Sequence, residues 1–289
     1  MTTREQWIAG ARPKTLPAAI APVLVGTSFA GYNATFLHTL LALIVALSLQ
    51  VGVNYANDYS DGIKGTDADR VGPMRLVGSG AATPDAVKKA AFLSFFIASL
   101  AGLILASRTS WFLVALGALC ILAAWTYTGG PKPYGYQALG EVSVFIFFGI
   151  VATVGTYYVQ TESVSREVLL ASFAMGALAC AILVLNNLRD LEKDQLSQKK
   201  TLAVVMGDKE TRNLYKWLMF FALVMSVALT FFSFYYLLAL IALPLVSKSV
   251  RAVTSGVSGT ALIDLLAKTG RIQIIYAVAL SFAAWLVAR

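Results

Sequence analysis

The chain is dominated by long apolar segments that alternate with short polar ones. A hydrocarbon core about 30 Å thick requires roughly 20 mostly apolar residues per helix. Only 13% of the residues are charged and 58% are hydrophobic, whereas soluble domains carry about 25% charged residues. We therefore expect an all-α, polytopic membrane protein with a single integral-membrane domain over residues 1–289. The nine predicted spans are 15–32, 37–57, 90–107, 111–128, 138–158, 167–187, 215–232, 234–248 and 271–288.

The distribution of basic residues predicts the orientation of these spans. A net charge of +8 could suit a nucleic-acid partner, but the basic residues lie between apolar runs, where positive charge sets membrane topology. With nine spans and a cytoplasmic N-terminus, 20 of the 23 Lys and Arg residues fall on the cytoplasmic side. We therefore expect no nucleic-acid partner, a cytoplasmic N-terminus and two long cytoplasmic loops, 58–89 and 188–214.

Polar residues gather at the end of the second predicted span. Asn54, Asn57, Asp58 and Asp61 fall within an arc of roughly 100° if the segment is helical. Acidic residues at membrane depth are costly and usually functional. This face is therefore a candidate site rather than a solvated helix end.

The sixth predicted span ends in a comparable way. Asn186, Asn187, Asp190 and Asp194 are also expected to share one helix face. Under the predicted topology both polar faces lie on the same side of the membrane, where they can meet.

Two such faces suit the chemistry of a magnesium diphosphate. Mg²⁺ takes oxygen ligands and binds through a few carboxylates plus substrate phosphates, and basic side chains can neutralise the remaining charge. A cation transporter is an alternative, but its ionisable residues would lie near the bilayer midplane rather than at one surface. The basic residues near the two faces are Lys64, Arg70, Arg75, Lys132, Arg189, Lys199 and Lys200.

These motifs lie in four longer segments that resemble a known family. The segments are ARPKTLPAAIAPVLVGT (11–27), NDYSDGIKGTDADRVGPMRLVGSG (57–80), YTGGPKPYGYQALGEVSVFIFFG (127–149) and NNLRDLEKDQLSQKKTLAVVMG (186–207). They resemble the UbiA superfamily of intramembrane aromatic prenyltransferases, and more narrowly its 1,4-dihydroxy-2-naphthoate polyprenyltransferase branch. One departure from the broader superfamily is Gly65, where an Asp would continue the spacing; Asp67 follows two residues later.

The resemblance implies nine helices around a central cavity that is capped on the cytoplasmic side and opens laterally to lipid. It implies a bacterial cell-membrane enzyme, with its site facing the cytoplasm, that uses Mg²⁺ to transfer a polyprenyl group from polyprenyl diphosphate to 1,4-dihydroxy-2-naphthoate with loss of carbon dioxide. Another acceptor, such as 4-hydroxybenzoate, is the alternative within the superfamily. Prenyl chain length and oligomeric state stay open.

Roles for individual residues follow from the motifs and the resemblance together. Catalytic roles are predicted for Asp58, Asp61, Asp190 and Asp194. Metal binding is predicted for Asn54, Asn57, Asp58, Asp61, Asn187, Asp190 and Asp194. Diphosphate binding is predicted for Lys64, Arg70, Lys132, Arg189 and Lys200, and binding of the aromatic acceptor for Arg12, Lys14 and Glu141.

Overall fold

The computed structural model describes residues 2–65 and 74–289, and these residues form helices joined by turns. The predicted all-α class is confirmed for this part of the chain. The elements in chain order are α1 (Arg4–Ala11), η1 (Pro13–Thr15), α2 (Pro17–Phe29), η2 (Gly31–Asn33), α3 (Phe36–Ile63), α4 (Pro84–Arg108), α5 (Phe112–Thr126), η3 (Tyr134–Tyr136), α6 (Gly140–Val144), η4 (Phe145–Val151), α7 (Ala152–Thr161), α8 (Arg166–Arg189), α9 (Leu191–Leu196), α10 (Leu202–Ala228), η5 (Leu229–Phe231), η6 (Phe234–Ala242), α11 (Leu243–Thr254) and α12 (Ala261–Val287).

Seven helical segments of the described chain are long and apolar enough to cross a membrane, where the sequence predicts nine spans. They are Phe36–Ile63, Pro84–Arg108, Gly140–Thr161, Arg166–Arg189, Leu202–Phe231, Phe234–Thr254 and Ala261–Val287. The first and fourth predicted spans correspond to the shorter apolar helices α2 and α5. With 13 and 15 residues, these two helices fall below the roughly 20 residues that a perpendicular crossing requires.

Local sequence signals explain where several helices begin. Thr83, the N-cap of α4, accepts a hydrogen bond from the backbone N–H of Ala86 through its side chain, and Pro84 occupies the first helical position. This arrangement satisfies an N–H that would otherwise have no partner at the helix start. Ser233 similarly caps η6 and separates it from α10–η5, so the seventh and eighth predicted spans correspond to two separate segments.

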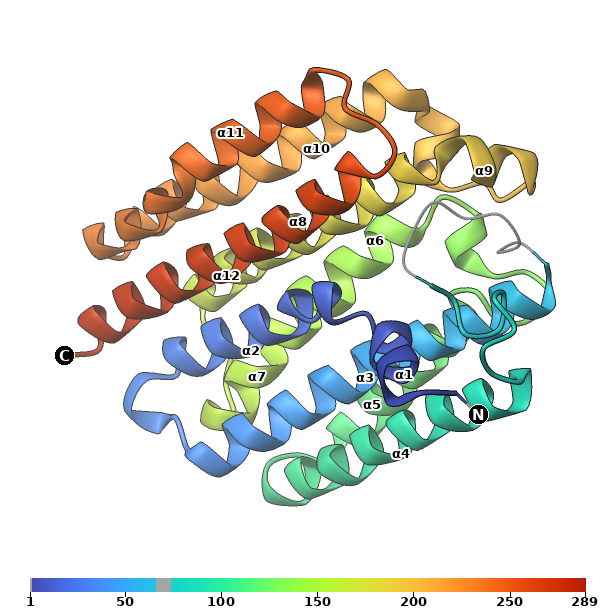
Figure 1. Cartoon of the computed structure of the whole chain (residues 1–289). Coiled ribbons are helices and arrows are strands. Elements are labelled where there is room, and N and C mark those ends of the chain that lie inside the picture. The colour runs from blue at the N-terminus through green and yellow to red at the C-terminus, as the bar shows by residue number, and fades with distance from the viewer. Residues whose placement is uncertain (1, 66–73) are drawn as a thin grey trace.

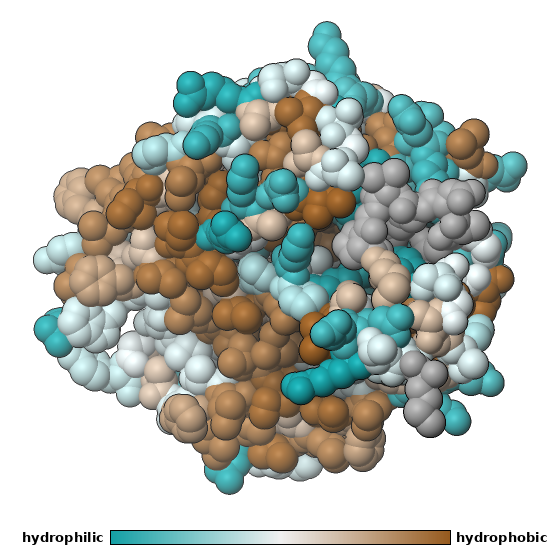
Figure 2. Space-filling model, in the orientation of Figure 1, coloured by the Kyte–Doolittle hydropathy of each residue, from teal (hydrophilic) through white to brown (hydrophobic). Residues whose placement is uncertain are grey.

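The long helices run side by side in one bundle (Figure 1). The C-terminal ends of α3 and α8 lie at the same end of the bundle, together with α9 (Figure 1). Apolar side chains cover most of the face shown in Figure 2, while hydrophilic ones gather toward the end that carries α9. The two polar motifs therefore share one end of an otherwise apolar molecule.

Helix α8 lies at the centre of the bundle. In its most apolar 18-residue window, 78% of the residues are buried, compared with 22% in α3. Its small residue Gly176 allows close approach of the fifth span, because a Cβ at Gly149 would lie 2.5 Å from the Gly176 Cα. Such contacts are typical of membrane helix packing and fix the position of the second polar motif.

Candidate active site

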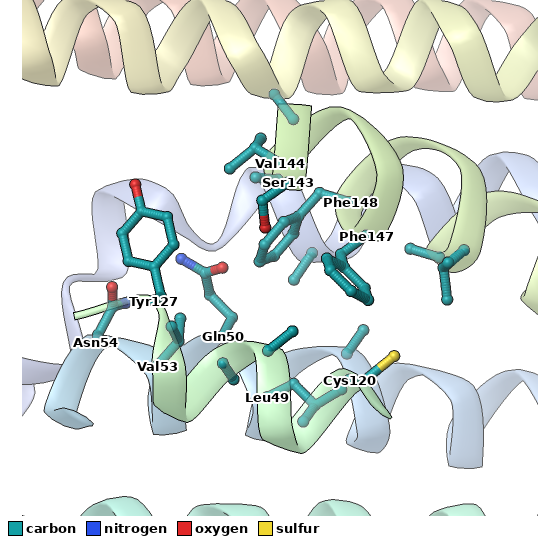
Figure 3. Close-up of a pocket in the computed structure, with 18 of the residues that line it drawn as sticks. Leu49, Gln50, Val53, Asn54, Cys120, Tyr127, Ser143, Val144, Phe147 and Phe148 are labelled. Carbon is teal, nitrogen blue, oxygen red and sulfur yellow. The ribbon is translucent and has the colours of Figure 1, made fainter. Parts of the chain in front are cut away.

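A cavity of about 560 Å³ extends into the bundle from the end that carries the polar motifs. The residues of α3 that line it change character along the helix. They are apolar near its middle, where Ala42, Val45 and Leu49 lie, and polar toward its C-terminus, where Asn54, Asn57 and Asp61 lie. The cavity therefore joins a polar end to an apolar interior, which Figure 3 shows around Leu49, Gln50 and Phe147.

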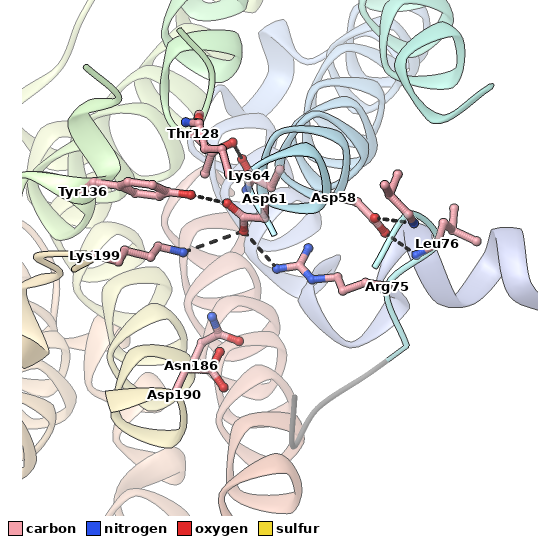
Figure 4. A network of polar contacts seen from close by, with 12 residues as sticks. Asp58, Asp61, Lys64, Arg75, Leu76, Thr128, Tyr136, Asn186, Asp190 and Lys199 are labelled. Atoms are coloured by element: carbon pink, nitrogen blue, oxygen red, sulfur yellow. Dashed lines mark hydrogen bonds and ion pairs between the residues drawn. The ribbon is translucent and has the colours of Figure 1, made fainter. Parts of the chain in front are cut away.

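The carboxylate of Asp61 is the centre of the polar end (Figure 4). It accepts a short hydrogen bond from the Tyr136 hydroxyl. Its Oδ2 lies 3.5 Å from Nη2 of Arg75 and 3.7 Å from Nζ of Lys199. The Asp61 side chain is only 3% exposed, so two cations and a phenol surround a buried anion.

Lys64 adds a third cation at the same place. Its Nζ donates a hydrogen bond of 2.7 Å to the carbonyl of Thr128 and lies 4.9 Å from the ring centre of Tyr136. Lys199 also lies over the Tyr136 ring, at 4.8 Å. Burial lowers the pKa of Lys64, and Asp61 partly offsets this effect. A cluster of cations against one carboxylate is suited to a multiply charged anion.

The second motif is divided between two helices rather than carried by one. Helix α8 ends at Arg189, Asp190 is its C-cap, and Asp194 belongs to α9. The expectation of one continuous helix face is corrected here, because the backbone of Asp190 leaves the helical conformation. Asp190 and Asp194 nevertheless both line the cavity, since the Asp194 N–H donates to the Asp190 carbonyl at 2.8 Å and keeps the next turn close.

Arg189 is held by the motif itself. Its guanidinium donates to both carboxylate oxygens of Asp190, at 2.7 and 2.6 Å, and to Oδ1 of Asn186 at 2.8 Å. This two-point contact fixes the Asp190 carboxylate in one orientation. Arg189, a predicted diphosphate ligand, is thus paired with a carboxylate at the polar end.

Glu141, predicted to bind the acceptor, contacts the second motif instead. It is 7% exposed and does not line the cavity. Its Oε1 accepts a hydrogen bond of 2.9 Å from Nδ2 of Asn187, and Asn187 lines the cavity. Glu141 therefore fixes the orientation of a cavity residue.

Asp58 has a different environment from the one predicted for a metal ligand. It is 1% exposed, it does not line the cavity, and its two carboxylate oxygens accept the backbone N–H groups of Leu76 and Val77 at 2.8 and 3.0 Å. The carboxylate holds the turn at Leu76 and Val77 and does not face the cavity. We therefore propose no metal-binding or catalytic role for Asp58.

Three predicted cations lie away from the cavity. The side chains of Lys14, Lys132 and Lys200 are exposed, and these residues have no part in the lining. Lys64 and Arg189 do not line the cavity either, although both lie at its polar end. Lys200 contributes its backbone, whose carbonyl accepts the N–H of Ala138 at 2.8 Å. Arg70, also predicted to bind diphosphate, lies outside the described residues, as does Asp67. Arg12 does line the cavity.

Some residues at the site were absent from the predicted set. Arg75 and Lys199 were recognised only as nearby basic residues, yet both form ion pairs with Asp61. Gln50 was not singled out, although its spacing from Asn54 and Asp61 by 4 and 11 residues places it on the same helix face. The spacing was a usable signal, whereas the approach of Lys199 depends on tertiary structure.

The donor atoms at the polar end fit a hard divalent cation. Within the described residues, no three Asp, Glu, His or Cys side chains come together as a complete metal site. Mg²⁺ needs no such cage, since it binds through one or two carboxylates, waters and substrate phosphates. Carboxylate and amide oxygens of Asn57, Asp61, Asn187, Asp190 and Asp194 line this end of the cavity.

The fifth span lines the cavity along its whole length because part of it is a π-helix. The lining residues recur every four positions, as 143–144, 147–148, 151–152, 155–156 and 159. In a regular α-helix each four-residue step would advance about 40° past a full turn. The π-helical segment η4, Phe145–Val151, contains wider turns, so the same face stays toward the cavity.

The UbiA prenyltransferase family matches residues 19–254. The chain is a member of the UbiA prenyltransferase family. The resemblance predicted from the four sequence segments is thereby confirmed.

Two similar proteins from different bacteria share one name. The chain is 49% identical to the 1,4-dihydroxy-2-naphthoate octaprenyltransferase of Mycobacterium tuberculosis (strain ATCC 25618 / H37Rv), with 97% of each chain covered. It is 38% identical to the protein of the same name from Escherichia coli (strain K12), covering 92% of this chain and 90% of that one. These names agree with the narrower branch that the sequence resembles.

The UbiA fold is also shared with solved structures. A UbiA homolog from Archaeoglobus fulgidus bound to GPP and Mg²⁺ superposes with a TM-score of 0.69 at 13% identity, covering 97% of this chain and 99% of that one. At this identity the likeness establishes the fold alone. It agrees with a helical, multi-pass membrane protein.

Proposed function

We propose that this protein transfers a polyprenyl group from polyprenyl diphosphate to 1,4-dihydroxy-2-naphthoate, with loss of carbon dioxide, to give a demethylmenaquinone-type product. The main support is a cavity that joins a cluster of cations and carboxylates to an apolar interior. Its two ends match the two parts of a prenyl diphosphate. The shared name of relatives that are 49% and 38% identical supports the choice of acceptor.

The polar end binds the diphosphate in this proposal. Arg75 and Lys199 exchange part of their contact with Asp61 for phosphate oxygens. Lys64, whose Nζ lies over the Tyr136 ring beside them, adds a third positive charge. A bound Mg²⁺, held through Asp61, Asp190 and Asp194, would supply further positive charge to the leaving group. Cleavage of the carbon–oxygen bond leaves the electron pair on the diphosphate, and preorganised cations stabilise the developing charge.

The later steps, attack on the allylic cation and loss of carbon dioxide, take place in the apolar interior of the cavity. The allylic cation, shielded from water, is attacked by the ring carbon of the naphthoate that bears the carboxylate, which forms the new carbon–carbon bond. The bond to the carboxylate then breaks, carbon dioxide leaves, and its electron pair restores the aromatic ring. Phe147 and Phe148 face this region from the fifth span (Figure 3), and aromatic faces stabilise cations.

An acceptor screen tests the proposal. Purified protein with Mg²⁺ and one long-chain prenyl diphosphate is given 1,4-dihydroxy-2-naphthoate or 4-hydroxybenzoate. We expect prenylation of the naphthoate with one carbon dioxide released per product. A product that keeps its carboxylate, or a preference for 4-hydroxybenzoate, would contradict the acceptor assignment. A protein that conducts ions across vesicles but transfers no prenyl group would instead favour the cation transporter. Membership of the UbiA prenyltransferase family does not support that alternative.

We also propose nine membrane crossings in a bacterial cell membrane, with a cytoplasmic N-terminus and the polar end of the cavity facing the cytoplasm. The excess of Lys and Arg on the predicted cytoplasmic side supports this topology. Single cysteines introduced at 195–205 should react with an impermeant reagent only from the cytoplasmic side, and those at 160–165 only from the opposite side. Labelling of cysteines at 195–205 from the outside would overturn the proposed topology.

A further inference from the structure

The side chain of Gln50 lies where the cavity changes from polar to apolar. It follows Leu49 on α3, about 6 Å along the helix axis from Asn54, and it is 6% exposed. Its amide points from α3 toward the segment that carries Ser143 and Phe148 (Figure 3). A polar group in this position requires an explanation, because a buried amide without partners is costly.

Hydrogen bonds determine which end of the Gln50 amide faces the cavity. The Thr15 hydroxyl donates its one proton to the carbonyl of Arg12 at 2.9 Å. It can therefore only accept the bond of 2.8 Å from Nε2 of Gln50. The amide nitrogen is thus fixed toward Thr15, and Oε1 is directed into the cavity, where it accepts no hydrogen bond from the described residues.

Ser143 on the opposite wall is constrained in the same way. The Tyr134 hydroxyl donates to the carbonyl of Ala123 at 2.8 Å. The contact of 3.0 Å between Tyr134 and Ser143 therefore uses the Ser143 proton. The free lone pairs of Ser143 Oγ remain, so Ser143, which also lines the cavity, is another hydrogen-bond acceptor without a proton to offer.

From these two acceptors we infer that Gln50 and Ser143 form the subsite for the hydroxyl groups of the aromatic acceptor. The inference rests on the proposed function and goes beyond it by assigning residues to the acceptor. A prenyl chain has no donor for either oxygen, whereas a 1,4-dihydroxylated ring has two. A ring bound here directs its carboxylate edge toward the polar end, where Arg12 lines the cavity. A single-hydroxyl acceptor leaves one of the two oxygens without a partner.

Steady-state kinetics of the full-length protein test the assignment. Gln50→Met and Gln50→Leu remove the acceptor oxygen with little change in volume, and Ser143→Ala removes the other. Each should raise the KM for 1,4-dihydroxy-2-naphthoate about tenfold and leave the KM for prenyl diphosphate within twofold. Ser94→Ala is the matched control, because Ser94 is a buried serine of α4 that bonds within its own helix and does not line the cavity.

Acceptor analogues distinguish the loss of a specific hydrogen bond from a general loss of packing around residue 50. Inhibition constants are measured for 1-hydroxy-2-naphthoate and 4-hydroxy-2-naphthoate. Each analogue keeps one of the two hydroxyl groups. The analogue that lacks the hydroxyl bound by Gln50 should have the same inhibition constant for the wild type and for Gln50→Met, whereas the other should bind Gln50→Met more weakly. Equal changes in both KM values, or loss of affinity for both analogues alike, would overturn the subsite. A wild type that does not prenylate 1,4-dihydroxy-2-naphthoate would instead refute the proposed function.

Discussion

Asp58 and Asp61 stand one helical turn apart, yet the structure predicts opposite consequences for replacing them. Asp58 accepts two buried backbone N–H groups and lies outside the cavity, whereas Asp61 lines it and contacts Arg75 and Lys199. Asp58→Asn should therefore reduce stability, and Asp61→Asn should reduce turnover.

The change in the free energy of unfolding caused by Asp58→Asn can be worked out from the two hydrogen bonds of Asp58. An asparagine keeps one acceptor oxygen but presents an NH₂ group to the other N–H, so one backbone donor loses its partner. Hydrogen bonds to charged groups contribute about 1.5–3 kcal/mol, and an unsatisfied buried group costs about 1–3 kcal/mol. We expect the free energy of unfolding to fall by about 2–5 kcal/mol. Some loss of turnover, within about fivefold, is also expected, because Arg75 immediately precedes the turn that Asp58 holds.

Thermal unfolding in detergent and turnover well below the unfolding midpoint separate the two effects. Asp58→Asn should lower the Tm by several degrees and remain active, while Asp61→Asn should lose at least about a hundredfold in kcat with a smaller change in Tm. Asp85→Asn, an exposed carboxylate at the start of α4, controls for the loss of one charge. An Asp58→Asn protein with an unchanged Tm and no turnover would refute this reasoning and favour the predicted metal role.

Three further predictions concern the cavity. A chelator should abolish turnover and added Mg²⁺ should restore it; full activity in chelator would exclude a metal-held diphosphate. Gly117→Leu should lower kcat/KM for a long prenyl diphosphate more than for a short one, because a Cβ at Gly117 meets nothing within 4 Å and its extra volume fills the cavity. Ala115→Leu, on an exposed part of α5 outside the cavity, is the control, and equal effects of the two changes would contradict the cavity assignment. Glu141→Gln should retain activity within about fivefold, since Gln keeps the acceptor for Asn187, whereas Glu141→Leu should lose about tenfold or more; equal loss in both variants would point to a need for the charge.

The sequence predicted the membrane-helix class and the meeting of the two polar motifs, because both depend on local patterns. Hydropathy over 18 or more residues identifies a span, and residues three or four apart share a helix face. The position of Asp61 within the cavity was predictable in this way. The predicted spans erred in length for α2 and α5, which are shorter than a full crossing.

The remaining features of the site depend on contacts between distant segments. Lys199 and Lys200 are adjacent in sequence, but the Lys200 backbone pairs with the segment around Ala138 and its side chain is exposed, while Lys199 reaches Asp61. Asp58 and Asp61 carry the same chemical group, and their contacts with distant segments distinguish their roles: the turn at 76–77 for Asp58 and Lys199 for Asp61. No local pattern contains this information.

The π-helical segment of the fifth span affects how relatives of this protein should be aligned. A single-residue deletion within Phe145–Val151 could convert the wide turns into regular ones. The residues that follow would keep their orientation, because the π-helical segment holds one residue more than regular turns of the same rotation. Gly155 and Val159 would then stay on the cavity wall, each one position earlier in the sequence. Homologues that lack one residue at this point should therefore keep the same set of lining residues. A gap-free alignment across η4 between a π-helical and a regular homologue would assign the deep part of the cavity to the wrong side chains.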